Sequence, residues 1–207
     1  MPGEILNRPR DARSQDVGGV CEHRVREQVQ CTVSVHAFVD ETKDNGLLVV
    51  AALVAPRDLR SARATMRGLL LPGQARLHFT KERPSRRAQI TAAVCATNVR
   101  IDVYDARGVR DPKRARALCL ERIVADLAAN RATRLVIEQD DSLVKHDQRV
   151  LHAAVRAADV IDALTYEHLP ARSEPLLWLP DAAAWCWTHG SAWRQRLSPV
   201  LGDVHIL

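Results

Sequence analysis

Acidic side chains lie at three widely separated places in the sequence: two at predicted strand ends and one within a predicted apolar helix. Asp40 and Glu41 close an apolar, β-branched segment. Glu138 closes a later apolar segment, and Asp181 lies in a third apolar stretch near the C-terminus. Side chains at strand ends of an α/β sheet converge on a crevice. Two carboxylates about 4 Å apart repel by about 4 kcal/mol at an effective dielectric constant of about 20, so three can share a pocket only with a cation between them.

The types of ligand indicate which cation this would be. Oxygen ligands without a cluster of His and Cys favour Mg²⁺ or Mn²⁺ over zinc, and the five cysteines show no CxxC or zinc-ribbon spacing. Two such ions about 4 Å apart would clamp the attacking and leaving oxygens of a phosphodiester. The chain has no GxxxxGK(S/T), GxGxxG, GxSxG or HExxH pattern, which excludes the common nucleotide-binding loops, the hydrolase elbow and the zinc proteases.

Positive charge gathers in the segment 56–87, which carries nine basic and two acidic residues although the net charge of the chain is only +5. A basic segment of this kind would guide a polyanion to the acidic centre. His78 lies in the same segment and is a candidate for positioning or proton transfer. The cations predicted to contact a nucleic-acid backbone are Lys81, Arg83, Arg86 and Arg87.

Each candidate also has a structural interpretation. An aspartate directly after a strand, such as Asp40, is often a turn former. A histidine between Leu and Phe, such as His78, is more often a satisfied core side chain than a base. Asp181 follows Pro180 and would meet the dipole of a first helical turn. The four tryptophans fill a core or an oligomer interface more readily than they stack bases, so the Trp-rich C-terminal helix is a candidate oligomer contact.

Hydrophobic periodicity predicts the elements that must position these residues. The turn signal at Asn45 and Gly46 predicts an antiparallel hairpin at the start, and the later strands alternate with helices long enough for parallel crossovers. This order is typical of an α/β fold with a mixed sheet flanked by helices. The predicted strands are 32–39, 47–55, 100–104, 133–138 and 163–168, with a short extended piece at 77–80; the predicted helices are 58–70, 84–98, 111–130, 146–158 and 174–188, the last interrupted by Pro180.

The 207 residues, 46% hydrophobic and 27% charged, are typical of a globular chain. Residues 1–29 are polar and broken by Pro and Gly, and they predict a flexible N-terminal arm ahead of one domain at 30–207. The longest apolar run, 46–56, is far shorter than the roughly 20 residues of a membrane helix. The opening residues have no apolar core of the secretory type. We therefore expect a cytoplasmic protein without a membrane segment.

Four segments together resemble the domain of unknown function 3800 family. In that family the first strand usually ends in Asp-Glu-Ser, a His-Phe pair follows the first helix, an acid closes a later strand, and an aspartate lies in the last helix. The resemblance covers about residues 31–190. The segments that carry it are FVDETKDNGLLVVAALV, LHFTKERPSRRAQI, LVIEQDDSLVKHDQRVL and SEPLLWLPDAAAWCW.

The resemblance implies a ribonuclease-H-like fold, a mixed sheet with antiparallel first strands flanked by helices, in which a small cluster of carboxylates binds divalent metal. Position by position, it implies that Asp40, Glu41, Glu138 and Asp181 are the acids of that cluster and that His78 is the histidine of the His-Phe pair. The chain departs from the pattern in three ways. Thr42 stands where serine is usual, Glu138 stands where many members carry aspartate, and no glutamate lies on the first predicted helix, so either Glu82 or Glu174 supplies it or the site is incomplete.

The sequence as a whole predicts a nuclease that hydrolyses phosphodiester bonds with Mg²⁺ or Mn²⁺ held by Asp40, Glu138 and Asp181. Glu41, Glu174 or His78 would assist by positioning or proton transfer. Two alternatives keep the fold: a nucleic-acid-binding protein without catalysis, and a hydrolase of small phosphorylated molecules. In a third alternative, the acids are structural and the Trp-rich helix makes an interface.

Overall fold

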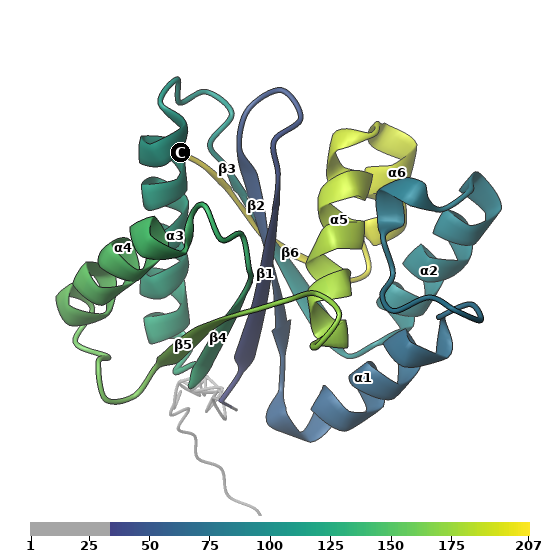
Figure 1. Cartoon of the computed structure of the whole chain (residues 1–207), viewed down its shortest axis with the longest axis horizontal. Helices are drawn as coiled ribbons and strands as arrows, with labels where there is room; N and C mark the ends of the chain where they lie inside the picture. The colour runs from purple at the N-terminus through teal and green to yellow at the C-terminus, as the bar shows by residue number, and fades with distance from the viewer. Residues whose placement is uncertain (1–33) are drawn as a thin grey trace, which may run out of the picture. The chain divides into compact units, whose positions relative to one another are not determined.

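A six-stranded mixed sheet forms the centre of the protein, for which a computed structural model describes residues 34–207 (Figure 1). Its strand order is β5-β4-β1-β2-β3-β6. The central strand β1 pairs antiparallel with β2 and parallel with β4, and the remaining pairs are β2 with β3, antiparallel, and β3 with β6 and β4 with β5, both parallel. The strands are β1 (His36–Thr42), β2 (Leu48–Val54), β3 (Val99–Asp105), β4 (Arg134–Glu138), β5 (Thr165–Leu169) and β6 (Leu201–Ile206).

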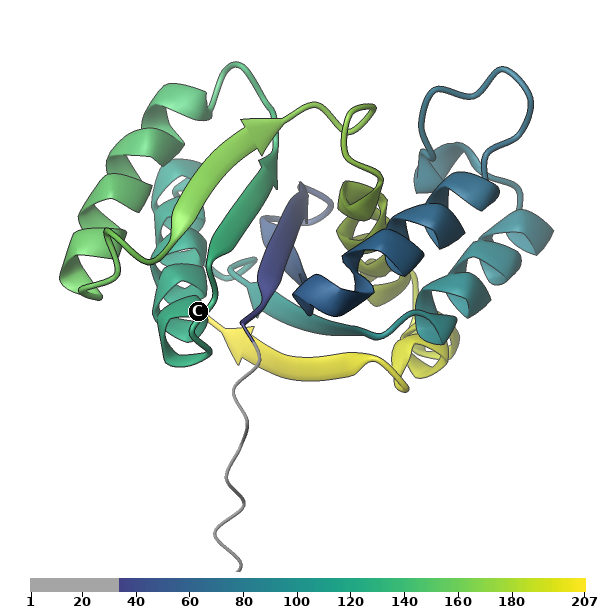
Figure 2. The same ribbon diagram turned by 90° about the horizontal axis from the view of Figure 1, so that it is seen from below.

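Helices cover both faces of the sheet (Figures 1 and 2). One face packs against α3 and α4, and the other packs against α1, α2, α5 and α6. Short 3-10 turns precede α1, α2 and α5. The helices are α1 (Leu59–Gly68), α2 (Pro84–Ala96), α3 (Pro112–Ala129), α4 (Val144–Ala157), α5 (Trp178–Thr188) and α6 (Ser191–Leu197), and the turns are η1 (Pro56–Asp58), η2 (Phe79–Lys81) and η3 (Pro175–Leu177).

Strand β2 shows why the sheet needs both helical layers. Every residue of β2 is buried. Val50 and Ala52 face the core beneath α5, while Val49 and Ala51 face the core beneath α3. A strand covered on both faces carries an apolar residue at every position, which accounts for the unbroken apolar run in this part of the sequence.

The predicted fold class is confirmed, since the first strands are antiparallel, the later strands are parallel, and helices flank the sheet. The predicted hairpin is confirmed as well: Asn45 and Gly46 adopt φ values of 59° and 104° between β1 and β2. The predicted start of α3 is also correct. The Asp111 side chain accepts a 3.0 Å hydrogen bond from the Lys113 N–H, and Pro112 is the first helical residue.

Two local predictions are wrong. The piece at 77–80 is not a strand, because Phe79–Lys81 forms the 3-10 turn η2, in which the Lys81 N–H donates to the His78 carbonyl at 2.9 Å. Pro180 does not interrupt α5. It is the third residue of the helix, and a first-turn proline costs no intrahelical hydrogen bond because the N–H that it lacks would have no partner there.

Two elements at the C-terminal end were not predicted. Helix α6 has only seven residues and begins directly after Gly190, so its hydrophobic period is too short to recognise. Strand β6 mixes Gly202, Asp203 and His205 with apolar residues and lies at an edge of the sheet. Edge strands need no continuous apolar pattern because part of their surface faces water.

The described residues belong to one compact unit, while the predicted arm at 1–29 lies outside them. Among the helices of residues 34–207, none is long and apolar enough to cross a bilayer.

The hairpin turn gives a direct test of the fold. A Cβ atom on Gly46 would lie 2.8 Å from the Arg107 Cα, whereas one on Gly73, which also has a positive φ of 83°, would meet nothing within 4 Å. We expect Gly73→Ala to lower the free energy of unfolding by about 1 kcal/mol through backbone strain alone, and Gly46→Ala to lower it by about 3 kcal/mol because the clash is added. Chemical unfolding of both variants measures this, and equal losses would contradict the packing of the turn against Arg107.

Candidate active site

A cavity of about 240 Å³ opens where β1 and β4 end. The two strands run parallel with Val39 opposite Ile137. Asp40 and Glu138, the residues next along each strand, therefore emerge at the same edge of the sheet. The cavity brings together most of the predicted site. It is lined by Asp40, Glu41, Thr42, Asp44, Arg76, His78, Thr80, Glu138, Asp181, Ala184 and Trp185.

Asp181 reaches this cavity from the first turn of α5, which packs across β1 and β2. Small buried residues, Ala182 and Ala183, lie beside it and let the helix approach the sheet. The Phe79 N–H in η2 donates a 3.1 Å hydrogen bond to Asp181 Oδ2. The turn that replaces the predicted extended piece therefore orients Asp181, and it also places His78 and Thr80 in the lining of the cavity.

Asp40 carries the strongest electrostatic perturbation in the cavity. Burial raises the pKa of Asp40 well above its ordinary value of 3.8, and the charges of Glu138, Asp181 and Glu41 raise it further. Only the Glu41 N–H, which donates to Asp40 Oδ1 at 2.8 Å, lowers the pKa. Among the described residues, the largest influences on the Asp40 pKa include no side-chain cation, so a peptide N–H is the main group that stabilises its ionised form.

The other two carboxylates are perturbed in the same direction. Burial raises the pKa of Asp181, against the Phe79 N–H and the charges of His78 and Arg76. Burial also raises the pKa of Glu138, against Arg76, whose Nη1 lies 2.9 Å from Glu138 Oε1. All three carboxyls therefore cost free energy when they ionise, as expected for acids that share one poorly hydrated pocket.

Glu41 has a different role, because two cations hold it. Its carboxylate lies 3.0 Å from Arg116 Nη1 and 3.5 Å from Lys43 Nζ. Arg116 is buried and also grips Asp147 with two hydrogen bonds of 2.6 and 2.7 Å, while His168 Nε2 lies 3.1 Å from Asp147. Arg116 thus ties the end of β1 to α4 and β5.

Oxygen ligands of this kind are those that Mg²⁺ and Mn²⁺ prefer, so the donor set fits a hard divalent cation. The side chains are not in a ready ligand arrangement, since no group of three or more His, Cys, Asp or Glu within 34–207 is placed to hold a metal ion. Arg76 beside Glu138 is one physical reason, because a guanidinium already satisfies one of its oxygens.

Two candidate glutamates lie elsewhere. Glu174, predicted as an assisting acid, is buried and paired with Arg63 at 2.7 Å, and its Oε1 caps η3 by accepting from the Leu176 N–H at 3.1 Å. Its charge acts on His36, at the opposite end of β1 from Asp40. Glu82 is buried against Gln74 and Arg86. Neither lines the cavity, so the structure does not supply the glutamate missing from the first helix.

A wider groove of about 730 Å³, here called the basic groove, adjoins the cavity and shares Arg76 and His78 with it. Lys81 and Arg83, both predicted backbone contacts, are exposed along it. A second groove of about 740 Å³, with Asp140 and Asp141 in its lining, shares Asp40 and Glu138 with the cavity. The basic groove is lined by Leu71, Gln74, Ala75, Arg76, His78, Lys81, Glu82, Arg83 and Arg86.

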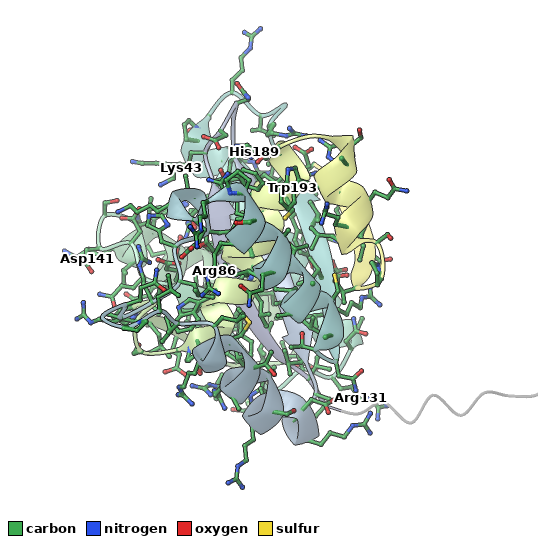
Figure 3. All side chains as sticks on the ribbon, turned by 90° about the vertical axis from the view of Figure 1, so that its right-hand side faces the viewer. Lys43, Arg86, Arg131, Asp141, His189 and Trp193 are labelled. Carbon is green, nitrogen blue, oxygen red and sulfur yellow. The ribbon has the colours of Figure 1, made fainter. Side chains whose placement is uncertain are left out.

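The other two predicted backbone contacts are engaged within the protein. Arg86 is largely buried, and its guanidinium donates to the Leu69 carbonyl and to Gln89; Figure 3 shows it lying against the ribbon, with Asp141 at the outer edge of the molecule. Arg87 donates to the Phe79 and Thr80 carbonyls at 3.1 and 2.6 Å and stacks on Trp185. Arg87 therefore holds the turn beneath the cavity.

The tryptophans are used mainly inside the fold. Trp178 is buried, and its indole N–H donates to the Ala171 carbonyl at 2.7 Å. Trp185 lines the cavity and packs against Phe79, His189 and Trp193 at centroid distances of 5.3, 3.9 and 5.3 Å. The role of this helix in an oligomer stays a prediction.

Spacing in the sequence could not single out Arg76 or Arg116. Arg76 lies in an irregular loop between α1 and η2, where the net positive charge of 56–87 was the only available signal. Arg116 lies 75 positions from the carboxylate of Glu41 that it contacts and stands among other arginines of α3, so only the tertiary structure reveals the pairing.

Asp40 provides a test of carboxylate crowding. A raised pKa in the folded state contributes stability below the unfolded pKa of about 4, and this contribution is lost as the pH rises through the folded value. We therefore expect Asp40→Asn, in chelator at pH 7 to 8, to raise the free energy of unfolding by about 1 to 2 kcal/mol, and the gain to vanish near pH 3. The control is Asp141→Asn, an exposed acid. A destabilised Asp40→Asn protein would contradict the crowding.

Asp147 should behave in the opposite way. Arg116 and His168 lower the pKa of Asp147 despite its burial, so its stabilisation is present above the unfolded pKa and is lost as the pH falls through the lower folded value. We expect Asp147→Asn to cost about 3 kcal/mol at pH 7, measured by urea unfolding. The matched control, Glu167→Gln, breaks the half-exposed pair with Arg134 and should cost less than about 1 kcal/mol. Equal costs would refute an anchoring role for Asp147.

Comparison with known proteins gives little at the level of sequence. No family model matches the chain, so its resemblance to the domain of unknown function 3800 family stays a prediction. No curated protein matches it either. Among solved structures, a chain of the PCNA:RNase HII complex from Archaeoglobus fulgidus is similar to it, with 16% sequence identity and a TM-score of 0.48 over 72% of this chain and 69% of that chain.

Proposed function

We propose that the protein is a metal-dependent nuclease that hydrolyses phosphodiester bonds in a nucleic acid. One observation carries the proposal: Asp40, Glu138 and Asp181, from distant parts of the sequence, line one cavity, and the pKa of each is raised there. Fold stability alone gives no reason to gather three acids that each resist ionisation. A divalent cation relieves this cost, and perturbed acids in a cleft are typical of functional sites.

Asp40, Glu138 and Asp181 are the residues that would hold Mg²⁺ or Mn²⁺. When bound, such an ion lowers the pKa of water and stabilises charge on the phosphoryl oxygens. His78 lines both the cavity and the basic groove, where it can hold or move a proton between site and substrate. Glu41 is held by Arg116 and Lys43, which fits a positioning role at the end of β1.

The surroundings of the cavity favour a polyanionic substrate. Lys81 and Arg83 are exposed in the basic groove directly beside the cavity, and cations arranged in this way bind a phosphate backbone with little regard to sequence. In the second groove Lys43 pairs with Asp140, while Asp141 adds a negative charge that would repel the same backbone. The substrate would therefore follow the basic groove to reach the carboxylates.

Two observations favour a second candidate, a nucleic-acid-binding protein of the same fold without catalysis. Arg76 already pairs with one oxygen of Glu138, and the carboxylates within residues 34–207 are not arranged as a metal-binding group. This alternative predicts binding that weakens steeply with salt and does not change when a chelator is added.

The test uses the full chain with Mg²⁺ or Mn²⁺ and labelled single-stranded DNA, duplex DNA, single-stranded RNA and RNA–DNA hybrid, with small phosphate esters in parallel. Loss of an outer-shell partner of a metal site costs about 10- to 100-fold, so loss of a ligand in Asp40→Asn or Asp181→Asn should lower cleavage by at least about 100-fold. Glu167→Gln, which lies outside the cavity and both grooves, should cleave as the wild type does.

The outcomes separate the candidates. Equal cleavage by the wild type and both cavity variants would mean a contaminating nuclease and would end the proposal. Chelator-independent binding without cleavage would support the binding protein instead. Turnover of small phosphate esters alone would identify a small-molecule phosphoester hydrolase.

A further inference from the structure

Arg76 stands between the two parts of the proposed site. It lines both the cavity that holds the three carboxylates and the basic groove beside it. It comes from the irregular loop between α1 and η2, and its side chain is 39% exposed. Because Arg76 lines both, its side chain can turn toward the cavity or toward the basic groove by rotation about its own bonds, without movement of the sheet.

The ion pair that holds Arg76 has only one hydrogen bond, fewer than some other arginine–carboxylate pairs of the protein. Among residues 34–207, only its Nη1 is hydrogen-bonded, to Glu138 Oε1 at 2.9 Å. Other arginines form bidentate pairs with carboxylates: Arg63 pairs in this way with Glu174, and Arg116 with Asp147. A monodentate, partly exposed ion pair is weak, so another anion can replace the carboxylate. The remaining N–H groups of the guanidinium are free to bind that anion.

A phosphate group in the basic groove would be a better partner for Arg76. The guanidinium fork matches two phosphate oxygens at once, and Lys81 and Arg83 line the same groove to hold a backbone there. Transfer of Arg76 to a phosphate would leave Glu138 uncompensated beside Asp40 and Asp181, which are its neighbours in the lining of the cavity.

We propose that Arg76 alternates between two partners: it binds Glu138 in the free protein and a backbone phosphate when a nucleic acid occupies the basic groove, which releases Glu138 to the metal. This inference rests on the proposed function, since it takes both a cation and a nucleic acid as ligands of this site. Substrate and metal then favour each other's binding, because each removes the other's competitor.

The experiment measures the two affinities separately on the full chain. Mn²⁺ binding is followed by calorimetry without nucleic acid, and binding of labelled single-stranded DNA is followed by fluorescence anisotropy in chelator. For Arg76→Ala we expect Mn²⁺ to bind about 2- to 5-fold more tightly, the range expected from a partly exposed ion pair, and DNA to bind more weakly. Arg83→Ala, the matched control in the same groove, should weaken DNA binding and leave Mn²⁺ binding unchanged.

A second variant guards against a general disturbance of the fold. Arg76→Lys keeps a charge beside Glu138 but has no fork, so we expect Mn²⁺ binding as in the wild type and weaker DNA binding. DNA should tighten Mn²⁺ binding to the wild type and should lose that effect on Arg76→Ala. The thermal midpoint of each variant confirms that it is folded.

The results that overturn the two proposals differ. If the wild type binds Mn²⁺ and Asp40→Asn does not, while Arg76→Ala binds it no more tightly than the wild type does, the exchange at Arg76 is refuted and the metal site stands. If the wild type binds neither Mn²⁺ nor DNA, the proposed function fails and the inference fails with it.

Discussion

The site depends on one energetically unfavourable arrangement: three carboxylates, those of Asp40, Glu138 and Asp181, line a single cavity. The parallel pairing of β1 with β4 brings the first two acids to the same edge, and the packing of α5 across β1 and β2 brings the third. Burial removes water from each carboxylate, and the charges of neighbouring acids act on Asp40 and Glu138 as well, so ionisation opposes folding. The apolar layers on both faces of the sheet must supply the free energy that holds the acids together.

Peptide N–H groups bind Asp40 and Asp181, whereas arginines pair with Glu138 and Glu41. The Phe79 N–H orients Asp181, and Arg87 holds the turn that carries this N–H by binding the carbonyls of Phe79 and Thr80. On the other face of the sheet, Arg116 and Asp147 anchor Glu41. Two polar networks thus set the geometry of the cavity from opposite sides.

The parts of the fold and site that depend on local pattern were predictable from the sequence. The hairpin at Asn45, the cap at Asp111 and the acids at the ends of β1 and β4 follow from turn chemistry, capping and the alternation of strands with helices. That β1 pairs with β4, and in which register, comes from the structure, and it is this pairing that brings Asp40 and Glu138 to the same edge.

What escaped prediction depends on partners far apart in the chain. The 77–80 piece forms a turn because Arg87 and Asp181 bind its backbone, and neither contact leaves a period in the sequence. Glu174 looked available for chemistry, but Arg63, 111 positions earlier, takes its carboxylate. Arg86 and Arg87 were predicted to contact a nucleic-acid backbone because the sequence shows their charge. It does not show that carbonyl groups of the protein itself accept their hydrogen bonds.

The distribution of positive charge around the cavity explains why a cation is expected at its centre and not at its rim. Glu41 has two cationic partners and Glu138 has one. The hydrogen bonds to Asp40 and Asp181 within the described residues come from peptide N–H groups, which carry no net charge. Such donors lower a pKa but cannot cancel the repulsion between two carboxylates. A small dication, by contrast, contacts several oxygens at once, at about 2.0 to 2.6 Å. The main group that stabilises ionised Asp40 is a peptide N–H, and at Asp181 burial outweighs the charges of His78 and Arg76. This balance is the physical basis for proposing the metal there.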